Sequence, residues 1–216
     1  MIKIENVVSP SAYEWKAVIE GMRNPMNSWA RSDTEIGSYP WDRGFYQIGE
    51  NDKSLMLQLA RGGGPHAKFR RMLPVYATIT APLFWWKEFD TYKIGTVANS
   101  CSTMHKIHSK EFTIEDFTCD VIAKDDRVLD FFRDIIRALN TYRDLYNETK
   151  DKKYWRTMIE LLPSSYMQKR TVMLNYEVLA QMYKWRWNHK LGEWCHFCEW
   201  IETLPLSEII TCERED

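Results

Sequence analysis

The stretch FDTYKIGTVANSCSTMHKIH, from Phe89 to His108, gathers side chains that can bind a ligand. It follows the aromatic run Phe84-Trp85-Trp86, and it places hydroxyls, a thiol, lysine and histidine where an apolar core pattern would continue. Such side chains form many hydrogen bonds and bury little apolar area, which suits contact with a ligand. The other interpretation of the segment is a solvated loop.

Three further patterns contain residue types that could carry chemistry. Cys101 and His105 have the spacing of a thiolate pair on a helix, but no oxyanion-hole motif accompanies them. The segment GGGPH, residues 62–66, lacks the Lys-Ser/Thr of a phosphate loop, which argues against nucleoside triphosphate hydrolysis. Cys195 and Cys198 have no second cysteine pair to complete a tetrahedral zinc site. We therefore expect no metal and no covalent nucleophile.

The composition is that of a folded protein. With 216 residues, 44% of them hydrophobic, the chain is long enough for one sizeable domain, which we expect to span residues 1–216. The 29 basic and 30 acidic side chains give a net charge of −1, so no basic field favours nucleic acid. An odd number of cysteines, five, without an apolar leader predicts reduced thiols in a cytoplasm. No run of about 18 apolar residues predicts a membrane span.

The first half of the chain mixes strand and helix patterns. Alternation and β-rich composition predict strands, whereas apolar residues at 3.6 spacing predict helices. The strands are expected at residues 2–8, 42–49 and 75–80. The helices are expected at residues 11–24, from 54 to the triple glycine at 62–64, and from 82 through the tryptophan pair. The pattern predicts an α+β fold with a small mixed sheet.

The second half is predicted to be helical. Residues 125–148 place apolar side chains on one stripe, with Asp125 or Asp126 as the cap. After Pro163, residues 164–190 read as one long helix capped by Ser164, and residues 191–202 as another. On the long helix, Asn175 and Arg186 share an apolar face, where two strong hydrogen-bonding groups need a partner. That partner is either another protein group or a polar ligand.

The ten tryptophans are unusually many, and they cluster at residues 85–86 and 185–200. Indole rings bury large areas and stack on flat rings. The clusters therefore predict a core or a subunit interface, with a platform for a planar cofactor as the alternative.

The order of these features resembles that of the flavin-dependent thymidylate synthases. A glycine and histidine turn, a strand ending in Ala81-Pro82, an aromatic helix, a polar segment and a later Leu-Pro follow one another over residues 54–205. The family's Arg-His-Arg-x-x-Ser signature falls on residues 91–96, and its Glu-x-Ser-Gly-Arg segment falls on residues 99–103. The register from Pro163 matches the family's Asn, Arg and Trp framework, with the matching positions Asn175, Arg186 and Trp194.

The resemblance implies an α+β domain packed by long helices, assembled as a homotetramer. It implies FAD as the cofactor, a dUMP-like pyrimidine nucleotide as the substrate, methylenetetrahydrofolate as the carbon donor, and reductive methylation of deoxyuridylate or a related base. The implied cofactor contacts are His66, Thr91, Tyr92, Lys93, Asn99 and Asn175. The implied substrate contacts are Glu88, Cys101, Ser102, Thr103 and Arg186, with Cys101 beside the pyrimidine ring.

This sequence departs from the family in its most specific motif. Both signature arginines are missing, and Lys93 replaces a bidentate fork with a point charge. A further family arginine before Leu-Pro falls on Ile159, where Arg156 could act from the neighbouring turn. These losses favour a second hypothesis: a repurposed or inactive homologue that serves as an oligomeric nucleotide- or flavin-binding module.

Overall fold

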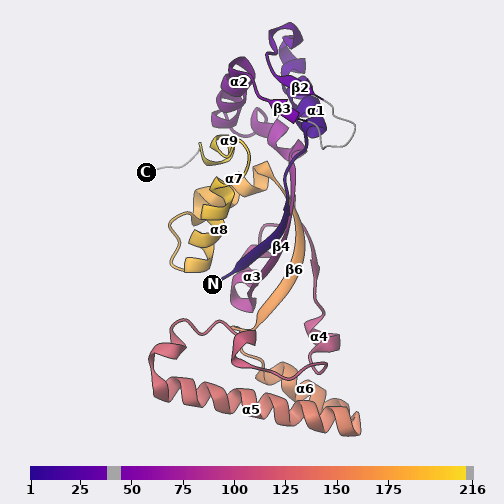
Figure 1. The fold of residues 1–216 in the computed structure, drawn as a ribbon, viewed down its shortest axis with the longest axis vertical. Coiled ribbons are helices and arrows are strands. Elements are labelled where there is room, and N and C mark those ends of the chain that lie inside the picture. The colour runs from indigo at the N-terminus through magenta and orange to yellow at the C-terminus, as the bar shows by residue number, and fades with distance from the viewer. Residues whose placement is uncertain (38–44, 213–216) are drawn as a thin grey trace. The chain divides into compact units, whose positions relative to one another are not determined.

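The computed structural model describes residues 1–37 and 45–212, which form an α+β fold (Figure 1). A four-stranded sheet has the order β1-β4-β6-β5, and β2 pairs antiparallel with β3. The strands are β1 Lys3–Val8, β2 Glu35–Gly37, β3 Phe45–Gln47, β4 Pro74–Pro82, β5 Val97–Ser100 and β6 Met167–Asn175. The α-helices are α1 Ala12–Arg23, α2 Glu50–Arg61, α3 Leu83–Phe89, α4 Thr103–Lys106, α5 Asp126–Thr149, α6 Lys152–Leu161, α7 Tyr176–Arg186, α8 Gly192–Glu202 and α9 Glu208–Thr211. Short 3-10 helices are η1 Asn24–Met26, η2 Trp29–Arg31, η3 Ala67–Met72, η4 Ile114–Asp116 and η5 Ile122–Lys124. The predicted α+β fold class is confirmed.

Contacts divide the chain into two compact units. Unit one comprises residues 1–3, 79–91 and 99–170, and unit two comprises residues 4–78, 92–98 and 171–216. Each unit has its own packing.

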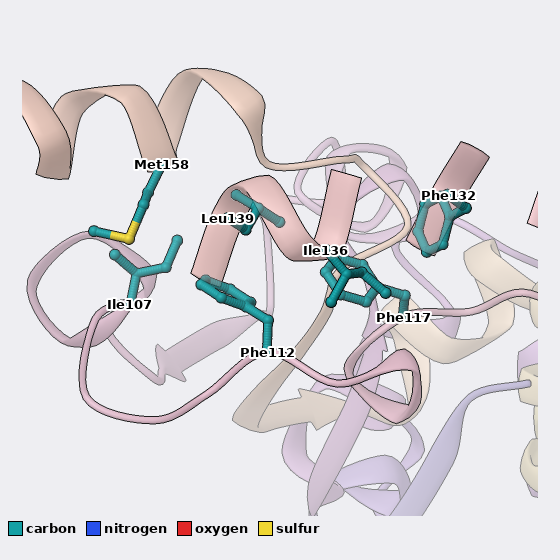
Figure 2. Packing of buried hydrophobic residues seen from close by; sticks show 7 residues of the cluster. All are labelled: Ile107, Phe112, Phe117, Phe132, Ile136, Leu139 and Met158. Carbon is teal, nitrogen blue, oxygen red and sulfur yellow. The ribbon is translucent and has the colours of Figure 1, made fainter. Parts of the chain in front are cut away.

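Unit one is built on a helical hairpin, α5 and α6, which lie side by side (Figure 1). Asp125 caps α5 by accepting a hydrogen bond from the Arg127 amide, as predicted. The helix ends at Lys150, whose left-handed conformation (φ 58°) lets the chain turn back into α6. The hairpin and the loop before it enclose an apolar cluster, shown in Figure 2, of Ile107, Phe112, Phe117, Phe132, Ile136, Leu139 and Met158.

Unit two has an aromatic core and buried ion pairs. Trp15 lies edge-on to Tyr176, and Trp194 lies edge-on to Phe197, with all four rings buried. Arg23 at the end of α1 pairs with Asp52 of α2 through a 2.6 Å contact, and both side chains are almost fully enclosed. Helices α7, α8 and α9 contact one another (Figure 1).

The predicted long helix over residues 164–190 is wrong. Residues 167–175 form the strand β6, whose inner residues Gln168, Val172 and Leu174 are buried at even spacing. The helix begins only at Tyr176, so its cap is Asn175 and not Ser164. The segment contains apolar residues that satisfy both periodicities, and pairing with the neighbouring strands β4 and β5 selects the extended form.

Smaller differences concern element boundaries. Helix α2 begins at Glu50, four residues before the predicted start, and Pro82 ends β4 and caps α3. The predicted strand at 42–49 overlaps β3, and its first three residues lie outside the described part of the chain. Among the residues that the structure describes, no helix is both long and apolar enough to cross a membrane.

Candidate functional site

Arg186 is held in a defined position at the end of α7 in unit two. Its Nε donates to the Tyr92 hydroxyl at 3.0 Å, and its guanidinium carbon lies 4.9 Å from the centre of the buried Trp194 ring. A third contact joins Nη1 to the His189 ring at 2.9 Å. A guanidinium fixed by a hydrogen bond and an aromatic face loses little side-chain entropy when a ligand binds. Arg186 is half-buried, which suits a group that recognises an anion or a carbonyl.

Asn175 lies beside the same loop. Its Oδ1 accepts a hydrogen bond from the Val178 amide at 3.0 Å and caps α7. Gly95 has φ +81°, and a Cβ added there would lie 2.7 Å from Asn175 Nδ2. The position therefore requires glycine for both its conformation and its space. Asn175 and Arg186 do not share a helix face as predicted, because Asn175 precedes the helix, yet both contact the loop that carries Tyr92 and Gly95.

The turn formed by Cys101, Ser102 and Thr103 belongs to unit one. The Cys101 amide donates to the Lys169 carbonyl at 2.9 Å, and Ser102 caps α4 through the His105 amide at 3.0 Å. The side-chain amide of Gln168 donates to the Cys101 carbonyl at 3.2 Å and to the Thr103 hydroxyl at 2.7 Å. The turn borders a cavity of about 460 Å³. The structure thus brings three of the predicted substrate contacts together.

The remaining predicted residues have simpler surroundings. Thr91 is exposed, and its hydroxyl donates to the Glu88 carbonyl at 2.7 Å. Lys93, Asn99 and His66 are exposed, and His66 precedes the helix η3. Their side chains are accessible to a ligand, and their cofactor roles stay predictions.

Two residues near the turn were missed by the sequence analysis. Gln168 and Arg170 lie on β6, and Arg170 Nε donates to Gln168 Oε1 at 2.9 Å. The pattern that could have identified them is a buried amide in a strand of alternating burial. The prediction of a helix over this segment hid that pattern. A Gln on the inner face of a strand needs partners for both ends of its amide.

The cysteines of α8 lack the surroundings of a metal site. Among residues 1–37 and 45–212, no group of three or more His, Cys, Asp or Glu side chains could hold a metal ion. Burial raises the pKa of the Cys198 thiol to about 12, which disfavours the thiolate that binds metals.

Comparison with solved structures places this fold with that of the flavin-dependent thymidylate synthases. One such structure, ThyX from Helicobacter pylori complexed with FAD and dUMP, shares 15% of its sequence with this chain, and each chain is covered to 99% with a TM-score of 0.70. A second structure of ThyX from Helicobacter pylori with FAD and dUMP gives a TM-score of 0.67 at the same identity and coverage.

A third structure of this fold is the UMP/dUMP methylase PolB from Streptomyces cacaoi, bound with 5-Br dUMP. It is 13% identical, covers 99% of this chain and 95% of its own, and has a TM-score of 0.62. No family model and no curated protein matches the sequence. At these identities the likeness establishes the fold, as the resemblance implied.

Proposed function

We propose that this protein binds FAD and a dUMP-like pyrimidine nucleotide and acts in the reductive methylation of that base. The proposal treats residues 1–216 as one working domain. The observation that carries it is the fixed Arg186 guanidinium, in a fold that solved structures with FAD and dUMP share over 99% of both chains.

Arg186 is the proposed nucleotide contact in unit two. A guanidinium donates to a carbonyl or a phosphate through up to five N–H groups. Tyr92 and Trp194 hold it in place before the ligand arrives, so the binding free energy is not spent on ordering the side chain. Cys101, Ser102 and Thr103 are the proposed contacts in unit one, where they border a cavity. Glu88 remains a proposed contact from the resemblance.

Unit two has side chains of the chemical types that bind an anionic cofactor. Lys93 supplies an ammonium group and His66 an imidazole, and both are exposed. These groups would contact FAD, with Lys93 as a point charge where an arginine would form a fork. Asn175 would act by fixing the start of α7 beside the Tyr92 loop, since its carbonyl oxygen caps the helix. Thr91 and Asn99 are further proposed cofactor contacts in unit one.

When bound, reduced FAD would supply the hydride of the reaction, with methylenetetrahydrofolate as the proposed carbon donor. The contribution of this chain is to bind and orient its ligands, because the described site has no activated nucleophile. Of the residues in this proposal, we assign the largest contribution to ligand positioning to Arg186.

We also propose a homotetramer, working in the cytoplasm. Large apolar side chains are exposed on helices of both units, with Phe131 of α5 65% exposed and Trp185 of α7 70% exposed. Exposed aromatic groups of this size favour an interface between copies. Light scattering at the mass of the 25.8 kDa chain across micromolar concentrations would contradict this assembly.

The test of function is ligand binding and turnover by the pure protein. FAD should bind with a visible flavin spectrum, and Arg186→Ala should weaken dUMP binding by about 2 kcal/mol while the protein stays folded. Calorimetry measures the affinity, and Arg137→Ala, which removes an exposed arginine of α5, is the matched control. Unchanged dUMP affinity with a large drop in melting temperature would make Arg186 structural.

Turnover separates the two functional hypotheses. Conversion of dUMP in the presence of methylenetetrahydrofolate and a reduced nicotinamide cofactor supports the enzyme. Binding of FAD and dUMP without turnover supports the binding module, and a protein that binds neither ligand refutes both.

A further inference from the structure

A cavity of about 500 Å³ lies in unit two, where α1 and the chain that follows it meet β2. Small-molecule sites in proteins have volumes of roughly 300–1,000 Å³, so this cavity can hold a small ligand. Of the described residues that line it, none is a proposed contact of FAD or of the nucleotide. Any ligand of this cavity therefore differs from those of the proposed function.

Helix α1 presents two opposite charges to the cavity. Lys16 and Glu20 both line it, one helical turn apart on the same face as Arg23. A glutamate four residues before a lysine pairs better than the reverse order, which α1 has. Within residues 1–37 and 45–212, neither side chain forms an ion pair. An ammonium and a carboxylate thus border one cavity without neutralising each other.

Trp29 gives the cavity a flat aromatic wall. The side chain is 49% exposed, and its Nε1 donates to Asn24 Oδ1 at 2.8 Å. This hydrogen bond satisfies the only polar group of the indole and holds the ring in one orientation. Ile19 and Ile36 add apolar lining. An exposed, oriented indole beside apolar side chains suits the stacking of a planar ring.

The hydrogen bonds behind the lining determine what its neutral polar groups can offer. The hydroxyls of Ser32 and Thr34 each donate to Asp52 Oδ2 at 2.7 Å, so the Ser32 oxygen can only accept from a ligand. Asn24 has the opposite role, because its oxygen already accepts from Trp29 and its Nδ2 can only donate. The lining therefore has two acceptors, Glu20 and Ser32, and two donors, Lys16 and Asn24.

Arg23 holds the lining in place from inside. It is 3% exposed, and its Nε donates to Asp52 at 2.6 Å. Its Nη1 donates to the Ser28 carbonyl at 3.2 Å, and its Nη2 donates to the Arg31 carbonyl at 3.3 Å. These bonds fix the backbone on both sides of Trp29. A lining that is ordered in advance loses little entropy when a ligand binds.

We propose that this cavity binds an aromatic α-amino acid in its zwitterionic form. Glu20 and Ser32 accept hydrogen bonds from the ammonium group of the ligand, Lys16 and Asn24 donate to its carboxylate, and its ring stacks on Trp29. A ligand with a single charge would leave either Lys16 or Glu20 without a partner. The proposal goes beyond the binding of FAD and a nucleotide and does not depend on it.

The first test compares ligands that differ by one charged group. Calorimetry with the full chain measures the affinities of L-phenylalanine, of 2-phenylethylamine, which lacks the carboxylate, and of 3-phenylpropionate, which lacks the ammonium group. Each truncated ligand should bind at least about tenfold more weakly than the amino acid, because it loses one charge-assisted contact. An amine or an acid that binds as tightly as the amino acid would overturn the proposal, as would no binding of L-phenylalanine, L-tyrosine or L-tryptophan at millimolar concentration.

The second test assigns each charge to its partner. Glu20→Gln should weaken L-phenylalanine binding by about tenfold and leave the affinity for 3-phenylpropionate unchanged, because that acid has no ammonium group. Lys16→Gln should weaken binding of the amino acid and spare that of 2-phenylethylamine. Lys190→Gln, the same change at an exposed lysine outside the cavity, is the control. An equal loss for all three ligands in both variants would contradict these assignments.

The aromatic wall is tested by Trp29→Leu, which should weaken L-phenylalanine binding by about fivefold. Trp185→Leu is the matched control, since Trp185 is 70% exposed and does not line the cavity. Melting temperatures confirm that both variants are folded. Equal affinities in wild type and a folded Trp29→Leu protein would remove the indole from the site.

The cavity and the proposed function can fail separately. Glu20→Gln should leave the affinities for FAD and dUMP unchanged, and a loss of dUMP binding together with that of the amino acid would overturn a separate site. Binding of L-phenylalanine by a protein that binds neither FAD nor dUMP would support the cavity and refute the proposed function.

Discussion

Arg23 in unit two and Arg170 in unit one both pair with an aspartate at short range, 2.6 Å to Asp52 and 2.7 Å to Asp90. Their surroundings differ. The side chains of Arg23 and Asp52 are 4% and 0% exposed, whereas those of Arg170 and Asp90 are 14% and 53% exposed. Asp52 also accepts hydrogen bonds from Ser32 and from both the amide and the hydroxyl of Thr34.

The comparison separates an enclosed ion pair from one whose carboxylate is half-exposed. Arg23 also donates to Ser28 and to the Arg31 carbonyl, and it borders two cavities, of about 500 Å³ and about 360 Å³. Arg170 instead connects a half-exposed carboxylate to Gln168, which holds the Cys101 turn at a cavity. A short ion pair near a cavity therefore does not by itself indicate function, and the two pairs differ in how far their carboxylates are enclosed.

The largest effect is expected at the buried pair. Asp52→Ala leaves the Arg23 guanidinium buried without its carboxylate, and we expect the free energy of unfolding to fall by about 3–5 kcal/mol. Urea denaturation measures it. Asp130→Ala, which breaks an exposed pair on α5, is the control and should cost under about 1 kcal/mol. A loss at Asp52 no larger than that of the control would remove the distinction between the two networks.

Protonation of Asp52 at low pH should also lower the free energy of unfolding. The loss should be smaller than for Asp52→Ala, because the side chain stays in place. Burial favours the neutral acid, but hydrogen bonds from Thr34, Ser32 and Arg23, with the Arg23 charge, outweigh it and lower the pKa of Asp52 below 3.8. A lowered folded-state pKa contributes stability above pH 3.8, and that stability is lost as pH falls through the folded-state pKa. Urea denaturation between pH 6 and pH 3 should show this loss, and Asp52→Asn should abolish the part due to Asp52.

The smallest effect is expected at the exposed end of the other network. Asp90→Asn should change the free energy of unfolding by less than about 1 kcal/mol, since solvent screens a half-exposed carboxylate. Thermal and urea denaturation measure this, with Asp90→Ala as a companion. A loss comparable to that at Asp52 would mean that Arg170, too, is primarily structural.

The sequence predicted local features well and non-local ones poorly. Helix α5 and its cap at Asp125 follow from a stripe of apolar residues and a neighbouring carboxylate, both readable within one window. Strand β6 was missed because its partners β4 and β5 lie far away in the sequence. The resemblance indicated the fold correctly even where periodicity misassigned this segment.

The sequence predicted which residue types belong to the site, but it did not predict the contacts that those residues make. Arg186 and Asn175 were identified as polar groups needing partners, but the partner of Arg186, Tyr92, lies 94 residues earlier in the sequence, and Asn175 caps its own helix at the Val178 amide. Gln168 was overlooked for the same reason. Its role depends on the strand face that it occupies, and no local pattern distinguished that face from a helical surface.

The helical hairpin of unit one has a consequence for the order in which the chain folds. Helices α5 and α6 are joined by the short turn at Lys150, so their contacts close only a small loop and cost little chain entropy. The sheet instead pairs β4 with β6, strands whose residues are separated by α3, α5 and α6 in the sequence. Contacts between near neighbours form faster than distant strand pairings. During refolding, the α5–α6 hairpin should therefore acquire protection from hydrogen exchange before β6 does, which makes it an early-forming part of unit one.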